Sequence, residues 1–239
     1  MSNSKYVDVV KLSPNCSKPR NHAIDRITPH HTAGVLSVES CLDWFAKSST
    51  QASCNYVIGK DGRVGLCVDE ANRAWTSSSR ENDNRAITFE CVNSYAGGDY
   101  PVSNETFEKL VLMCIDICQR YGKTKLLWIP NKDEALAYKL KDNEMLLTMH
   151  QWFANTNCPG KYLSDKFPEL AERVTAALNK KEDEKPMSEM DIAKNWAVKV
   201  GLIQGYGAGE YGWRDPMTRE QMATVLYRFY NMIEAGKQK

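Results

Sequence analysis

Residues 86–92 read Ala-Ile-Thr-Phe-Glu-Cys-Val, and this stretch defines the centre of the predicted fold. Its apolar side chains alternate with the polar ones of Thr88 and Glu90, which is the two-residue period of a β-strand. Because the stretch is rich in residues that favour strands, we predict a central, half-buried strand. Glu90 then lies opposite a purely apolar face, either as a salt-bridged acid or as a carboxylate with a chemical role.

Strands and helices are predicted on both sides of this stretch. Residues 55–58 and 63–69 form a hairpin, because the Asp-Gly pair between them supplies the positive φ angle of a tight turn. Ser37 and Ser103 each cap a helix that carries an apolar stripe. The remaining predicted elements are an irregular arm over 6–22, a strand over 23–28 with Pro29 at its end, a strand over 126–129 and a helix over 162–178. This alternation indicates an α/β protein.

Length and charge limit the organisation of the chain and its partners. A chain of 239 residues is long enough for one core and a small second module. The charged, proline-containing stretch 180–190 predicts a linker between a domain over 1–179 and a module over 191–239. Lys and Arg total 31 against 30 acidic residues, so we expect no nucleic-acid partner and no membrane partner. The first residues lack a basic segment followed by an apolar run, which predicts synthesis in the cytoplasm without a signal peptide.

Eight cysteines are scattered through the chain. A chain of this size does not need disulfides to fold, and several cysteines replace small apolar residues. Cys114 and Cys118, for example, lie four residues apart on one predicted helix face. We therefore predict that most of the cysteines are reduced core residues.

Histidines and one cysteine form a candidate metal site. His30 and His31 lie together at the end of a predicted strand, and His150 and Cys158 lie eight residues apart on a segment that ends in Pro-Gly. Two imidazoles and a thiolate are typical ligands of a zinc site with a fourth position open to water. A His/Cys pair is also compatible with a structural metal site. His22 has no motif around it and is expected at the surface.

Five motifs follow one another within residues 20–178: His30 to Gly34, Asn55 to Val64, Ala74-Trp75, Ile87 to Asn93, and His150 to Gly160. In this order they resemble the type 2 N-acetylmuramoyl-L-alanine amidases, the zinc amidases of phage endolysins and bacterial autolysins. The resemblance implies a mixed central β-sheet flanked by helices, with zinc in an open cleft. It also implies that His30, His150 and Cys158 are the zinc ligands, with His31 as the alternative to His30.

The same resemblance suggests roles for the other site residues. Glu90 matches a catalytic glutamate that would take a proton from zinc-bound water and give it to the departing nitrogen. Thr156 matches a position that donates to the developing oxyanion, or that fixes the metal loop by bonding main-chain groups. His31, Trp75 and Asn93 are predicted to contact the substrate, although Trp75 fits a core position equally well.

A second resemblance covers residues 187–234. The segments 191–193, 196–197, 201–206 and 218–221 resemble an S-layer homology repeat, a small all-α module that binds secondary polymers of Gram-positive cell walls. Such modules usually occur in threes, and this chain carries one copy. The resemblance therefore implies a wall-polymer partner, self-association of several chains, or both.

Together these features predict a peptidoglycan hydrolase that cleaves the amide bond between N-acetylmuramic acid and L-alanine. Zn²⁺ is the expected cofactor and bacterial peptidoglycan the expected partner. The enzyme would act as an endolysin or autolysin on the cell wall after its release. The alternative is a recognition module that binds peptidoglycan without cutting it. Cys158 argues against this alternative, because noncatalytic relatives typically lack that ligand.

Overall fold

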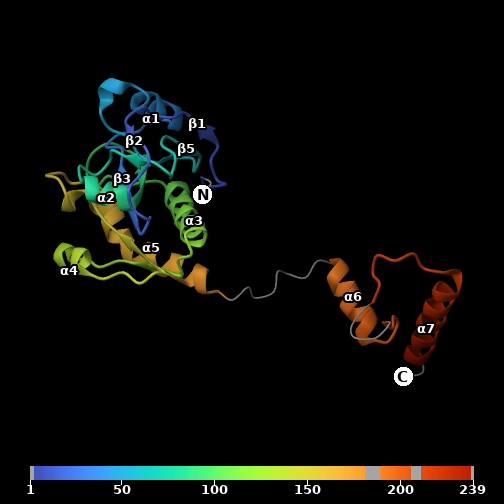
Figure 1. Cartoon of the computed structure of the whole chain (residues 1–239). Helices are drawn as coiled ribbons and strands as arrows, with labels where there is room; N and C mark the ends of the chain where they lie inside the picture. Colours follow the sequence, from blue (N-terminus) through green and yellow to red (C-terminus); the bar gives the residue numbers. More distant parts are fainter. Residues whose placement is uncertain (1–2, 181–188, 206–210, 238–239) are drawn as a thin grey trace. The chain divides into compact units, whose positions relative to one another are not determined.

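The computed structural model describes residues 3–180, 189–205 and 211–237. The chain forms two compact units, Met1–Lys180 and Lys181–Lys239, each with its own secondary structure (Figure 1). Most of the predicted linker lies outside the described residues, as does part of the glycine-rich loop that contains Tyr206. The first unit is an α/β domain, and the described residues of the second form helices and loops.

The first unit is built on a seven-stranded sheet in the order β1-β5-β4-β7-β3-β9-β8. β4 and β5 are antiparallel and the other neighbouring strands are parallel, so the sheet is mixed, as the resemblance implied. β7 (Ala86–Cys91) lies in the middle, which confirms the prediction from its alternating sequence. The other strands of this sheet are β1 (Val9–Val10), β3 (Arg26–His31), β4 (Tyr56–Ile58), β5 (Val64–Leu66), β8 (Lys125–Leu127) and β9 (Glu144–Leu147).

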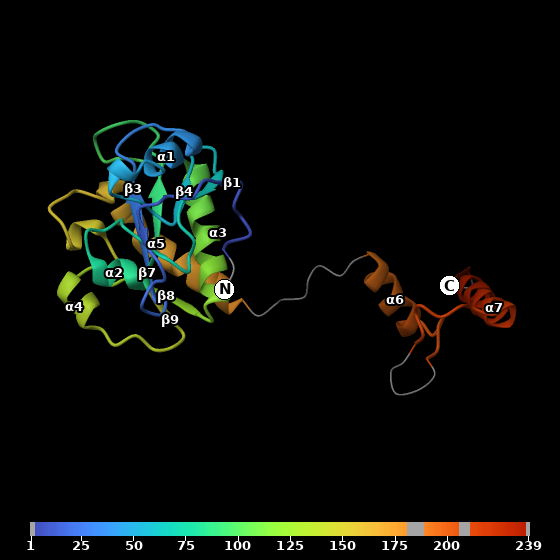
Figure 2. The ribbon, with the colours of Figure 1, turned by 45° about the horizontal axis from the view of Figure 1, so that its top comes forward.

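Helices cover both faces of the sheet. α3 (Asn104–Arg120) and α5 (Gly160–Asn179) lie side by side on one face, where they form the main core with the apolar side chains of β7 (Figure 2). α1 (Val38–Phe45) packs on the opposite face, so close that a side chain at Gly65 of β5 would collide with it. The predicted α/β class with a sheet between helices is therefore confirmed.

Local sequence signals explain where several elements begin. Ser37 Oγ accepts a hydrogen bond from the Ser40 N–H, and Ser103 Oγ accepts one from the Thr106 N–H, each at 3.0 Å. Both predicted N-caps are therefore confirmed. Gly62 has a φ angle of 78°, the positive value that the predicted hairpin requires.

Strand β3 differs from its prediction. It extends over Arg26–His31, so Pro29 lies inside a central strand, while both histidines lie at its carboxyl end, as predicted. The Ile27 carbonyl accepts from the Thr148 N–H at 3.0 Å, and the register with β9 ends at this residue. The nitrogen of Pro29 also faces β9, but Pro29 lies beyond the last residue of β3 that pairs with β9. Its missing N–H therefore breaks no hydrogen bond of the ladder.

Elements too short for a periodic signal were not predicted. One of them is β9, whose four residues are all buried. This strand matters for the site because His150 follows shortly after its end. The arm over 6–22, predicted to be irregular, contributes the two-residue strands β1 and β2. β2 (Cys16–Ser17) pairs with another unpredicted strand, β6 (Arg73–Ala74). The remaining unpredicted elements are α2 (Arg80–Arg85), α4 (Lys132–Ala137), and the 3₁₀-helices Ser48–Thr50 and His150–Trp152.

The cysteines agree with the prediction from composition. All eight are free thiols, and seven of them are buried, with Cys16 half-buried. In the parts of the chain that the structure describes, no helix is both long and apolar enough to cross a membrane.

The second unit contains α6 (Glu189–Lys199) and α7 (Arg219–Lys237). Thr218 caps α7, because its Oγ1 accepts a hydrogen bond from the Gln221 N–H at 3.1 Å. Large apolar side chains of both helices are exposed, among them Trp196 and Tyr230. The wall-polymer partner or self-association expected for this unit stays a prediction.

Candidate metal centre

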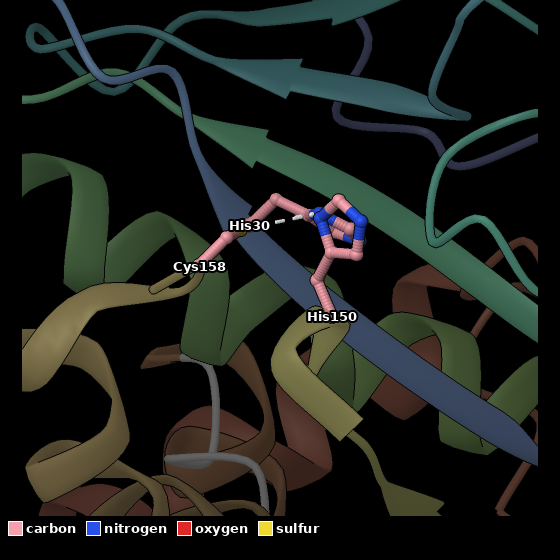
Figure 3. Close-up of side chains that lie close together, drawn as sticks. All are labelled: His30, His150 and Cys158. Carbon is pink, nitrogen blue, oxygen red and sulfur yellow. Dashed lines mark hydrogen bonds between the residues drawn. The ribbon is translucent and has the colours of Figure 1, made fainter. Parts of the chain in front are cut away.

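Three separate segments bring His30, His150 and Cys158 together (Figure 3). His30 lies near the carboxyl end of β3, and His150 follows β9, the neighbouring parallel strand. Cys158 lies on the loop that leads into α5. Because parallel strands end at the same edge of a sheet, the two histidines meet at the edge where α/β proteins bind ligands.

The donor atoms of these side chains form a compact cluster. Nδ1 of His30 lies 3.3 Å from Sγ of Cys158, and the candidate donor atoms of all three residues lie within 4.8 Å of one another. The imidazole rings of His30 and His150 have centroids 4.8 Å apart. Donors that share a tetrahedral zinc ion at about 2.0–2.3 Å lie about 3.3–3.8 Å from each other. His30 and Cys158 are therefore already separated by a suitable distance.

The surroundings of the cluster favour neutral imidazoles. Burial holds the pKa of His30 well below its ordinary value, and the nearby His150 lowers it further. Burial also lowers the pKa of His150. The pKa of the Cys158 thiol is raised by burial and then by the Glu90 carboxylate. Neutral imidazole is the form that binds metal, whereas the thiol would release its proton to an arriving cation.

Two ring nitrogens of the cluster are buried without a hydrogen-bond partner among the residues that the structure describes. Nε2 of His30 and Nε2 of His150 are buried and make no hydrogen bond within the described residues. Buried polar atoms almost always have a partner, so these two require an explanation. A cation takes one nitrogen from each ring, so it would account for Nε2 of His150, while His30 already faces Cys158 with Nδ1. A donor set of two imidazoles and a thiolate favours zinc. The residues present therefore fit a zinc ion.

Glu90 lies beside His30 on the neighbouring strand. The two residues are register partners on β7 and β3, so their side chains project from the same face of the sheet. Glu90 is half-buried, and its shielded Oε2 has no hydrogen-bond partner among the described residues. Burial, followed by the nearby Cys67, raises the pKa of Glu90 to about 8. No basic side chain of the described residues contributes to this pKa shift, which is unlike a salt-bridged strand acid.

Thr156 and His31 both hold loops near the cluster. Thr156 Oγ1 accepts a hydrogen bond from the Cys158 N–H at 3.3 Å, which fixes the loop but leaves the hydroxyl proton available for another acceptor. His31 does not belong to the cluster of three donors. Its Nδ1 accepts from the Ala33 N–H at 2.9 Å, and its ring stacks on Tyr100 with centroids 4.1 Å apart.

Trp75 and Asn93 have partners within the protein. Trp75 is half-buried, and its Nε1–H donates to Ser17 Oγ at 3.1 Å. Asn93 is fully buried, and its side-chain amide donates to the Tyr100 carbonyl at 2.8 Å. Asn93 therefore shapes the loop after β7 from inside the protein. The substrate contact predicted for Asn93 stays a prediction.

Two residues that shape the site were not predicted. Tyr100 has a φ angle of 54° and presents its ring to His31. Gly160 has a φ angle of 81°, and a Cβ atom there would come within 3.0 Å of the Asp99 carbonyl oxygen and 3.2 Å of the His31 ring. The Pro-Gly pair was the available signal for Gly160. The stack of Tyr100 depends on the return path of its loop, which has no local sequence signal.

The chain is similar to several known proteins. The sequence profile described as N-acetylmuramoyl-L-alanine amidase matches residues 20–161. The structure of PlyL shares 16% sequence identity with this chain and has a TM-score of 0.48. The match covers 70% of this chain and 95% of the PlyL chain. The endolysin amidase LysCS from Clostridium intestinale URNW shares 16% sequence identity with this chain and has a TM-score of 0.46. That match covers 74% of this chain and 100% of the LysCS chain. No curated protein matches the chain.

Proposed function

The chain belongs to the N-acetylmuramoyl-L-alanine amidase family, and on this premise we propose that it hydrolyses the amide bond between N-acetylmuramic acid and L-alanine of the peptidoglycan stem peptide. The observation that carries this proposal is the cluster of His30, His150 and Cys158 with Glu90 beside it. Three protein ligands leave a fourth position for a reacting group, which suits hydrolysis better than a structural metal site.

We assign His30, His150 and Cys158 to hold a zinc ion, which would polarise the scissile carbonyl and lower the pKa of a water molecule at the open position. The protein keeps both imidazoles neutral by burial, so that they are ready to bind. β3 holds His30, the 3₁₀-helix after β9 holds His150, and the loop before α5 holds Cys158. This placement on rigid elements favours a fixed ligand geometry.

We assign Glu90 the roles of general base and general acid. Its unpaired Oε2 can accept a proton from the attacking water, whose oxygen forms a bond to the carbonyl carbon. The raised pKa allows Glu90 to hold that proton and then pass it to the nitrogen of L-alanine as the C–N bond breaks. The products are the carboxylate of the lactyl group and the free amine of the peptide.

Three further residues receive lesser roles. The Thr156 hydroxyl would donate to the oxygen that develops negative charge, although a neutral donor stabilises it less than an ammonium group would. His31 and Trp75 are retained as proposed substrate contacts. Trp75 is the better candidate for a sugar platform, because an indole ring offers a large apolar face.

We further propose that the enzyme acts on the bacterial cell wall as an endolysin or autolysin. Peptidoglycan is the substrate that its family implies. The reaction would separate the stem peptides from the glycan strands and so weaken the wall.

The proposed activity is tested on purified Gram-positive peptidoglycan by counting new L-alanine amino termini. The samples are wild type, chelator-treated wild type with and without added zinc, and Glu90→Gln. We expect new termini with the wild type, loss on chelation, recovery with zinc and strong loss in the variant. If the wild type binds peptidoglycan but exposes no termini, the protein is a recognition module instead.

We propose that the second unit binds a polymer of the cell wall. The supporting observation is a cavity of about 540 Å³ beside α7. Tyr211 and Trp213 stack there with centroids 5.6 Å apart, and Asp215, Glu220 and Arg228 also line it. Aromatic faces beside charged and polar groups are a chemistry that suits saccharides.

Binding of the full chain to purified cell walls tests this second proposal. Trp213→Ala should weaken the binding, while the release of termini from soluble peptidoglycan fragments stays unchanged. Sedimentation of the same samples measures self-association through the exposed apolar side chains of the unit. An unchanged affinity of the variant for cell walls would contradict the proposed role of the cavity.

A further inference from the structure

The main-chain ladder that joins β3 and β9 ends before it reaches the two histidines. The Asp25 carbonyl accepts from the Leu146 N–H at 2.9 Å, and the Ile27 carbonyl accepts from the Thr148 N–H at 3.0 Å. The next residue to face β9 is Pro29, which has no N–H to donate. Main-chain bonds of this ladder therefore do not extend to His30 and His150, so another interaction must set how far apart they lie.

A ring of three side chains lies at this point. Thr28 and Thr148, each two residues before a histidine of the cluster, have their Oγ1 atoms 2.7 Å apart. Asn82, from α2, contacts both of them: its Nδ2 donates to Thr28 Oγ1 at 3.0 Å, and its Oδ1 accepts from Thr148 Oγ1 at 3.2 Å. All three residues are fully buried.

The hydrogen bonds of this ring have one consistent direction. Asn82 donates to Thr28 and accepts from Thr148, so the remaining bond runs from Thr28 to Thr148. Arg26 fixes the orientation of the amide, because its Nη1 can only donate and lies 3.2 Å from Asn82 Oδ1. Each member thus donates once and accepts once within the ring, which leaves no buried hydroxyl group unpaired.

Asn82 is itself held firmly. Its main-chain N–H donates to Ser79 Oγ at 3.2 Å, which caps α2, and its Nδ2 also donates to Ser77 Oγ at 3.3 Å. Ser77 Oγ in turn donates to Asp83 Oδ1 at 2.6 Å. The amide of Asn82 therefore has little freedom to follow a movement of either strand.

We infer that Asn82 is a positioning residue that, through Thr28 and Thr148, fixes the separation of His30 and His150. The ring takes the place of the main-chain hydrogen bond to β9 that Pro29 cannot make. It lies two residues before each of the two histidines. The inference rests on the proposed function, because it assumes that both histidines bind the same cation. Outer residues that orient metal ligands typically change metal affinity about 10-fold to 100-fold when they are replaced.

Cobalt binding to the full-length, metal-free chain tests this inference. Co²⁺ serves as the probe because its bond to the Cys158 thiolate gives an absorption band that reports binding without any turnover. Thr148→Val removes the hydroxyl at nearly constant shape, whereas Thr148→Ser retains it. We expect Asn82→Leu and Thr148→Val to weaken Co²⁺ binding about tenfold or more. Thr148→Ser keeps the hydroxyl and should bind Co²⁺ with near wild-type affinity.

A matched control separates positioning from general loss of stability. Asn15 is also buried, and its amide donates to the carbonyls of Phe45 and Lys47 at 3.0 and 2.8 Å, on an arm that carries no proposed ligand. Asn15→Leu should lower the melting temperature and leave Co²⁺ affinity unchanged. The double variant of Asn82 and Thr148 should lose little more affinity than either single variant, because the two act as one unit.

Each outcome decides a different point. Wild-type affinity in Thr148→Val, or an equal loss of affinity in Asn15→Leu, would overturn the positioning role while the proposed amidase activity stands. Failure of the wild type to develop the thiolate band would instead remove the metal site on which the proposed function rests.

Discussion

The buried His30 imidazole should make the metal-free protein less stable in mild acid. In the folded state, burial holds the pKa of His30 well below its ordinary value of about 6.5, whereas the unfolded chain recovers that value. Between these two pKa values the unfolded state binds more protons than the folded state. The free energy of unfolding must therefore fall as the pH drops through this window.

The size of this effect follows from the linkage relation. Protonation of an unfolded histidine with a pKa of about 6.5 lowers its free energy by about 0.1 kcal/mol at pH of about 7.5, and by about 1.4 kcal/mol at pH of about 5.5. Because burial holds the pKa of His30 well below its ordinary value in the folded protein, most of the difference appears as lost stability. His150 should add to the loss, but less, since it is only half-buried.

Urea unfolding of the chelator-treated chain at the two pH values measures this loss. Other groups also titrate, so the informative quantity is the difference between wild type and His30→Gln, which cannot take up a proton. We expect stability to fall about 1 kcal/mol more in the wild type than in the variant. Equal losses in the two proteins would show that His30 is protonated in the folded state, and would refute the argument from burial.

Three further outcomes are expected. Glu90→Gln should lower kcat by about 10²- to 10⁴-fold while the zinc content per chain, measured by metal analysis, stays unchanged; a loss of bound zinc would make Glu90 part of the metal site instead. Thr156→Val should lower kcat by about tenfold and Thr156→Ser should not, which steady-state kinetics can compare; equal activity in both would leave only the loop-fixing role. Gly160→Ala should lower the free energy of unfolding by about 1–3 kcal/mol, because the φ angle is positive and the new Cβ would meet the Asp99 carbonyl. Urea unfolding measures this loss, and unchanged stability would mean that the loop adapts.

Local rules were enough to predict the centre of the fold. The alternation over residues 86–92 gave β7, and the Asp-Gly pair gave the hairpin of β4 and β5. Both signals depend only on neighbouring residues, which is why they can be read without the rest of the chain. Pro29 misled the prediction of β3, because a proline in a central strand is tolerated only where the adjacent strand has already ended.

The candidate site required contacts that no local rule supplies. His30 and Cys158 are 128 residues apart in the sequence, so only their ligand chemistry and a family resemblance linked them. Asn93 lies in a motif next to the site, yet its buried amide serves the loop that carries Tyr100. Asn82 has no motif at all. Its position in the ring depends on how α2, β3 and β9 pack, which the sequence of any one of them does not determine.

Burial is the largest cause of the pKa shifts at the site. It lowers the pKa of His30 and His150, which keeps both imidazoles neutral and ready to bind a cation. It also raises the pKa of Glu90, which suits the proposed role of that carboxyl group as a proton carrier. The same burial makes the site sensitive to any cation, because a bound positive charge favours the carboxylate and the thiolate. Binding of a cation should therefore stabilise the fold and lower the pKa of Glu90 together, and thermal unfolding with and without added zinc measures the first of these effects.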